Sequence, residues 1–318
     1  MSDSALIPQY PAGEDKYLRD RGETIVHIRL RRSIWKIAVA TLLLMAVGSA
    51  TRVMNAGLAC PDWPLCYGQL VPTQQMNLQV FLEWFHRLDA ALIGLSTLLL
   101  VGSSWWFRHQ LPRWLPWATT FAMSLILVQG ALGAFTVTEL LRFDIVTAHL
   151  GTALLFFVTL LTIGTCLLPV TQSSSHPVAQ FPAWLPLTAA ICVYVQSIIG
   201  GLVGSRWALH QCFGNSELCT VMNSHIIGVV PATLSCVAVT IAIWRNRDLP
   251  TYFYRLAAVV GGLLIGQILL GVATFKLHLQ VETLTVAHQS IGATLLGTLV
   301  VITVLSWRLK PSQPASQF

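Results

Sequence analysis

The chain has 318 residues, of which 54% are hydrophobic and only 10% are charged. Soluble domains usually carry about 25% charged residues, so this composition excludes an ordinary soluble protein and indicates a membrane protein. The formal net charge of +6 does not indicate nucleic-acid binding, because the basic residues lie beside the ends of apolar segments, where they orient membrane helices.

Eight apolar segments are long enough to cross a bilayer, which takes about 20 residues of helix. Because backbone polar groups in lipid must be satisfied within the segment, each span is predicted to be a helix. The predicted spans are residues 33–53, 79–103, 114–136, 145–169, 183–205, 221–244, 253–275 and 283–307. The sequence therefore predicts an all-α integral membrane protein with eight transmembrane helices.

Both ends of the chain are predicted to lie in the cytoplasm, as tails of residues 1–32 and 309–318. The first tail is polar and contains no apolar core followed by a cleavage site, so the first helix is expected to serve as its own insertion signal. Basic residues flank the helix ends that would face the cytoplasm under the positive-inside rule. They are Arg29, Arg31, Arg32, Lys36, Arg108, Arg113, Arg245, Arg247, Arg308 and Lys310.

A polar linker, residues 171–182, divides the membrane part into two halves, residues 33–170 and 183–308. The pattern Gln-x-x-x-Gly recurs in three helices, at Gln129 and Gly133, Gln196 and Gly200, and Gln267 and Gly271. Because an even number of helices separates corresponding positions, the two halves share one orientation in the membrane. The predicted architecture is two four-helix bundles related as a parallel repeat.

Four histidines near the starts of even-numbered helices follow the same duplication. His86 and His149 are 63 residues apart, and so are His225 and His288. We expect all four inside the apolar region near its outer face, where ionisable residues are costly and usually functional. Histidine is a common metal ligand and often holds haem iron.

The matched spacing favours two haem sites over histidines that only pack or hydrogen-bond between helices. Neither half has the dense Cys, His and carboxylate cluster typical of zinc or copper. Nearby small residues are expected to leave room for the macrocycle: Gly151, Ala153, Gly228, Gly292 and Ala293.

Glu83 distinguishes the first half from the second. It lies three residues before His86 and on the same helical face, whereas no acid precedes His225 at the matching place. This asymmetry favours a proton-handling role for Glu83 at a reactive first site, with an electron-transferring second site. The alternative is an interfacial carboxylate in the headgroup region.

Three arginines at outer helix ends are candidates for pairing with haem propionates: Arg52, Arg87 and Arg206. Arg52 and Arg206 are interpreted as corresponding positions of the two halves. The alternative is that these side chains extend to lipid headgroups.

The external loops contain two pairs of cysteines, Cys60 with Cys66 and Cys212 with Cys219. Outside a bacterial membrane, each pair can form a disulfide that closes a short loop. A dithiol that exchanges electrons is the alternative. Three further cysteines inside helices are expected to be inert packing: Cys166, Cys192 and Cys236.

The chain resembles the haem A synthases of bacteria and mitochondria over nearly its whole length. The resemblance rests on residues 48–52 (GSATR), 57–66 (GLACPDWPLC) and 83–87 (EWFHR), and on the three further helix-start histidines. The paired loop cysteines are typical of a group of bacterial members. The resemblance implies oxidation of the C8 methyl of haem O to a formyl group.

The resemblance also implies roles for these residues. His86 and His149 would flank the substrate haem O beside the catalytic Glu83, and His225 and His288 would bind a haem b cofactor. Cys60 and Cys66 match the functional loop pair of the family. A haem O synthase would supply the substrate, a terminal oxidase or its assembly factors would receive the product, and the electron partner is unknown. The expected location is the bacterial cell (inner) membrane, within lipid, with the haem sites toward the extracytoplasmic face.

Two other functions are compatible with parts of the pattern. A di-haem cytochrome would transfer electrons without changing a substrate, but such proteins usually place their haems near opposite faces of the membrane. A thiol–disulfide carrier would use Cys60 and Cys66, but it leaves the histidine spacing unexplained.

Overall fold

The computed structural model describes residues 25–169, 180–204, 217–278 and 280–309. In these residues the structure contains eight helices long and apolar enough to cross a membrane, and no β-strand. The helices are α2 (Ile25–Val53), α3 (Leu78–Trp106), α4 (Leu115–Thr138), α5 (Phe143–Cys166), α6 (Trp184–Val203), α8 (Glu217–Arg245), α9 (Thr251–Lys276) and α10 (Glu282–Arg308). The eight predicted spans are confirmed, and the chain is a multi-pass membrane protein.

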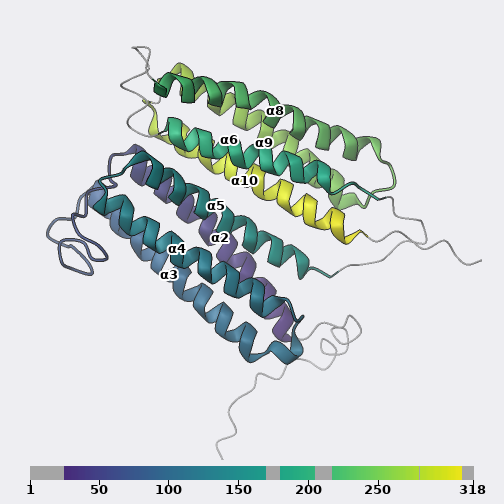
Figure 1. Cartoon of the computed structure of the whole chain (residues 1–318), viewed down its shortest axis with the longest axis horizontal. Helices are drawn as coiled ribbons and strands as arrows, with labels where there is room; N and C mark the ends of the chain where they lie inside the picture. Colours follow the sequence, from purple (N-terminus) through teal and green to yellow (C-terminus); the bar gives the residue numbers. More distant parts are fainter. Residues whose placement is uncertain (1–24, 170–179, 205–216, 279, 310–318) are drawn as a thin grey trace, which may run out of the picture.

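The helices form two groups of four that lie side by side (Figure 1). One group is α2 to α5, and the other is α6, α8, α9 and α10. They meet where α10 packs against α2 and α5 and where α6 packs against α5. Burial is greatest at this interface: 56% of the membrane window of α10 is buried, against 11% in α4. The outer helices therefore present their apolar surface to lipid.

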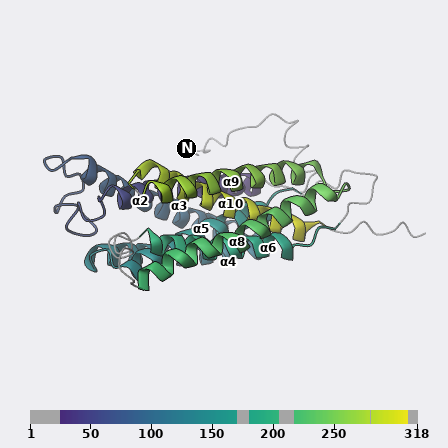
Figure 2. The ribbon, with the colours of Figure 1, turned by 90° about the horizontal axis from the view of Figure 1, so that it is seen from above.

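Local chemistry explains several helix boundaries. The side chain of Asn77 caps α3 by accepting a hydrogen bond from the Val80 N–H at 2.9 Å. Pro116 lies in the first turn of α4, where a backbone N–H would have no partner within the helix, so the lack of one in proline costs no hydrogen bond. The connection between α2 and α3 projects beyond one end of the bundles (Figure 2).

Helix α2 begins eight residues before the predicted span, inside the segment expected to be a polar tail. Within that segment Leu30 is buried at 7% exposure, and Arg31 Nη1 donates to the Leu167 carbonyl at 3.1 Å. The apolar face of α2 thus extends toward the N-terminus and stays packed in a stretch whose overall composition is polar.

Two arginines satisfy the carbonyl groups at the end of α5, at the membrane face opposite to the projecting loop. Arg308 of α10 donates to the carbonyls of Thr165 and Leu168, and Arg31 donates to Leu167. The last carbonyls of a helix have no partner within it, and a cation also suits the negative end of the helix dipole. This contact joins the two groups of helices.

We expect Arg308→Ala to lower the free energy of unfolding by about 1.5–3 kcal/mol, the usual contribution of hydrogen bonds to a charged group. The measurement is thermal unfolding in an uncharged detergent. The control is Arg113→Ala, which removes an exposed arginine. Equal melting temperatures for the two variants would contradict the stabilising contact.

Candidate functional site

The four membrane histidines lie at matched depths. His86 and His225 come eight residues after the first residue of α3 and α8, and His149 and His288 come six residues after the first residue of α5 and α10. At 1.5 Å per residue they lie about 9–12 Å along their helices. All four of these helices begin at the end of the molecule that carries the projecting loop.

Each histidine ring packs against a glycine on the preceding helix. At three of these glycines an added Cβ atom would lie only 2.8–3.0 Å from the Cε1 atom of the ring, so a side chain there would displace the imidazole; at the fourth, Gly133, the distance is 3.4 Å, close to an ordinary contact. The contacts pair Gly48 with His86, Gly133 with His149, Gly200 with His225, and Gly271 with His288.

The two histidines of each half lie near each other. The helices that carry them lie across each four-helix group from one another: α3 and α5 both pack on α2 and α4, and α8 and α10 both pack on α6 and α9. The Nδ1 atoms of His86, His149 and His288 are buried and have no hydrogen-bond partner among the described residues. The backbone of Leu44, Gln129 or Gln267, one turn before the contacting glycine, interacts with each of these rings. A backbone carbonyl at one ring nitrogen is a common partner of an imidazole whose other nitrogen binds a metal.

Glutamines orient both histidines of the second half. Gln196 Nε2 lies 3.0 Å from Nδ1 of His225 and donates to the carbonyl of the same residue at 2.7 Å. Gln267 Nε2 lies 3.4 Å from Nε2 of His288. Side-chain contacts of this kind fix the orientation of a ligating imidazole.

The first half lacks these contacts. Leu44 stands one turn before Gly48, where the other three helices carry glutamine. Gln129 Oε1 and Gln267 Oε1 are both buried without a partner in the described part of the chain, but the Gln267 amide also contacts a histidine ring through Nε2. The rings of the second half are therefore fixed by protein groups that the first half does not use.

Three glycines expected to face a macrocycle have other neighbours. A Cβ atom at Gly228 or Gly292 would press on the side chain of Gln196 or Gln267, and one at Gly151 would press on α6. These small residues make room for the orienting glutamines and for contact between the halves, which corrects that expectation.

A cavity of about 480 Å³ opens between α6 and α8. Its lining is Ile199, Leu202, Thr220, Val221 and Ser224. Two of these residues adjoin the contact between Gly200 and His225 in the sequence. A mostly apolar cavity of this kind suits a flat apolar ligand.

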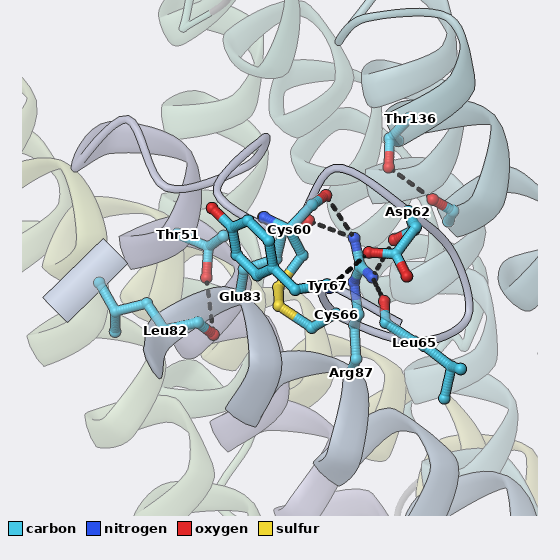
Figure 3. A network of polar contacts seen from close by, with 11 residues as sticks. Thr51, Cys60, Asp62, Leu65, Cys66, Tyr67, Leu82, Glu83, Arg87 and Thr136 are labelled. Carbon is cyan, nitrogen blue, oxygen red and sulfur yellow. Dashed lines mark hydrogen bonds and ion pairs between the residues drawn. A yellow bond between two sulfur atoms is a disulfide. The ribbon is translucent and has the colours of Figure 1, made fainter. Parts of the chain in front are cut away.

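The loop between α2 and α3 is fastened to α3 by Glu83 and Arg87 (Figure 3). Glu83 is buried at 4% exposure. Its Oε2 accepts from the Cys60 N–H at 2.7 Å, and its Oε1 pairs with Arg87 at 2.5 Å. Arg87 also donates to three loop carbonyls, those of Cys60, Asp62 and Leu65. Arg87 therefore holds the loop, a role that its place at a helix end did not reveal.

The structure contains the predicted disulfide between Cys60 and Cys66. Both cysteines are buried and pack against the first turn of α3. Arg206, Cys212 and the side chain of Cys219 lie outside the described residues, so the second disulfide stays a prediction. The three helix cysteines are unpaired, as expected: Cys166, Cys192 and Cys236.

Asp62 orders the turn that follows it. Its carboxylate accepts from the N–H groups of Gly68 at 2.7 Å and Tyr67 at 2.6 Å. These donors, that of Gly68 foremost, hold the pKa of the Asp62 carboxyl below its ordinary value. Because the pKa is lower in the folded loop, the stabilisation is present at neutral pH and is lost as the pH falls through the lowered pKa.

We therefore expect Asp62→Ala to make the loop more accessible to pepsin at about pH 5, where the native carboxylate is charged. The rates of the variant and the native protein should converge as the pH is lowered toward about 2. Taking the ratio of the two rates removes the pH dependence of the protease itself. A constant ratio would contradict the role of the charged carboxylate.

The fold and these sites define a class: an eight-helix membrane protein with one pair of partly buried histidines in each four-helix group. The chain belongs to the COX15-CtaA family, described as cytochrome oxidase assembly protein, which it matches over residues 31–300. The expected resemblance is thereby confirmed.

Named relatives include heme A synthases and a protoheme IX farnesyltransferase. A heme A synthase from Shewanella oneidensis is 30% identical, covering 86% of this chain and 96% of the relative. A heme A synthase from Shouchella clausii is 25% identical, covering 90% of this chain and 99% of the relative. A shorter match, 35% identical, joins 31% of this chain to 21% of a protoheme IX farnesyltransferase from Halobacterium salinarum.

The glycine contacts make a matched test possible within one helix. Gly271→Ala should push the His288 ring from its place and reduce the haem retained by the purified protein. Gly262→Ala, also in α9, meets nothing within 4 Å and should retain native haem content with equal or slightly higher stability. The measurement is haem per protein by pyridine haemochrome. Equal haem content in the two variants would show that the contact is unimportant.

Proposed function

We propose that this protein is a haem A synthase that oxidises the C8 methyl group of haem O to a formyl group. The observation that carries the proposal is the pair of partly buried histidines in each half, at matched depth and with each ring packed against a glycine. Membership of the COX15-CtaA family and the names of the relatives support the same chemistry.

The residues present fit haem. Haem iron is often held by imidazole nitrogen, and each half offers two imidazoles from helices that lie diagonally across the four-helix group. We assign His86 and His149 to the substrate haem O, and His225 and His288 to a haem b cofactor. When bound, the haem supplies the oxidative chemistry, and the protein supplies position and surroundings.

The difference between the halves supports this assignment. The rings of His225 and His288 contact glutamine amides, which suits a cofactor held permanently in one geometry. The first half instead has a buried carboxylate three residues before His86. We infer that the Oε atoms of Glu83 hold a proton during oxidation, while Arg87 and the Cys60 N–H fix the place of the carboxylate.

We further propose the orientation and partners of the protein. The histidines lie toward one end of the helices and the Arg31 and Arg308 contacts toward the other, which supports an extracytoplasmic site and cytoplasmic termini in the bacterial cell (inner) membrane. The partial likeness to protoheme IX farnesyltransferase supports a haem O synthase as supplier. The family description supports a terminal oxidase as recipient of haem A.

The test is expression together with a haem O synthase, followed by extraction and mass analysis of the haems. The native protein should yield a formylated haem. Glu83→Gln should reduce conversion by about 100-fold or more, a usual loss for an acid–base group, and should retain the spectrum of the second haem. Glu139→Gln, which changes an exposed acid at the end of α4, is the matched control.

Two outcomes would contradict this function. Unchanged haem O in a protein loaded normally with haem would indicate an electron-transfer cytochrome. Full conversion by Glu83→Gln would remove Glu83 from the chemistry.

A further inference from the structure

Arg52 extends from the first half of the molecule into the second. It lies in the last turn of α2, yet its Nη2 donates to Gln289 Oε1 of α10 at 3.2 Å. A Cβ atom at Gly204, the residue that ends α6, would lie 3.0–3.1 Å from Nη1, Nη2 and Cζ of the guanidinium. The guanidinium therefore rests on the end of α6.

This position is close to the second histidine pair. Gly204 comes one turn after Gly200, which contacts the ring of His225. Residues four apart share one face of a helix, and one turn advances about 5.4 Å. The charge of Arg52 thus lies about one turn outward from His225, on the same face of α6.

The same register changes the expected correspondence between the halves. Arg52 follows Gly48 by four residues, whereas Arg206 follows Gly200 by six. The position equivalent to Arg52 is therefore Gly204. Because Gly204 has no side chain, the guanidinium of Arg52 from the first half occupies the space beside it.

The cation lacks an anionic partner within the described chain. The ion pairs of the described residues do not include Arg52, and its Nε is buried without a hydrogen-bond partner. A buried charge that is neither paired nor fully hydrogen-bonded is costly. Its single described hydrogen bond is to a neutral amide, so the position suits an anionic ligand.

We propose that Arg52 binds a propionate of the haem held by His225 and His288, so that the first half supplies a charge to the site of the second. The inference rests on the proposed function, because it takes that haem as the ligand. Propionates are the anionic groups of haem b, and guanidinium and carboxylate groups match in geometry and charge. Arg52 is then a positioning residue for the cofactor and joins the halves through it.

The test compares two ligands that differ only in the charge of the propionates, haem b and haem b dimethyl ester. Full-length protein carrying His86→Ala, so that the second site is the one measured, is produced in haem-deficient cells and purified in an uncharged detergent. With Arg52 present, haem b should bind at least about tenfold more tightly than the ester. Arg52→Gln should bind both ligands equally, and Arg52→Lys should retain part of the preference.

Two controls separate this role from a structural one. Arg142→Gln removes an exposed arginine between α4 and α5 and should keep the native preference. The midpoint potential of the haem should fall in Arg52→Gln but not in Arg142→Gln, because a nearby positive charge favours the reduced iron. A residue that only clamps the helices would weaken both ligands alike and leave their ratio unchanged.

The outcomes distinguish the inference from the function on which it rests. If Arg52→Gln keeps the native preference for haem b, the inference is wrong and the proposed function stands. If the protein with Arg52, His225 and His288 intact binds no haem, both are wrong.

Discussion

The packing of each histidine ring against a bare backbone is the constraint on which the other features depend. Each imidazole occupies the space between two neighbouring helices opposite a glycine, and at Gly48, Gly200 and Gly271 an added Cβ atom would lie within 3.0 Å of the ring. Each contact fixes both the separation of two helices and their register along the membrane. Because the contact is repeated in four helix pairs, both halves present two rings at one depth. Packing and ligand geometry are therefore set by the same residues.

The halves share this framework and differ in what surrounds it. In the second half, glutamine amides contact the rings of His225 and His288. In the first half Leu44 occupies the corresponding place near His86. The polar contacts of that half are instead those between Glu83 and the disulfide loop. A ring fixed by amides suits a permanent cofactor. A site beside a loop-bound carboxylate suits a ligand that must arrive, react and leave.

The sequence predicted what depends on local composition and missed what depends on contact. The eight spans were predictable because hydropathy and length act within each segment, whereas the early start of α2 depends on Leu30 packing against other helices. The histidines and the Gln-x-x-x-Gly pattern were each visible, but their contact was not, partly because Gly48 follows Leu44 in place of glutamine. Likewise, the residues around Arg87 in the sequence do not indicate that the carbonyls of the loop between α2 and α3 accept hydrogen bonds from it.

The interface between the halves is fastened near both ends by arginines that cross it in opposite directions. Arg308, from the second half, donates to carbonyls that end α5 of the first, so its hydrogen bonds are made with the protein itself. Arg52, from the first half, lies against Gly204 and Gln289 of the second. A cation matched by helix-end carbonyls is a structural clamp. Among the described residues Arg52 is matched only by one amide and by no anion, and this difference favours the histidine end of the interface, and not the opposite end, as the place for a charged ligand.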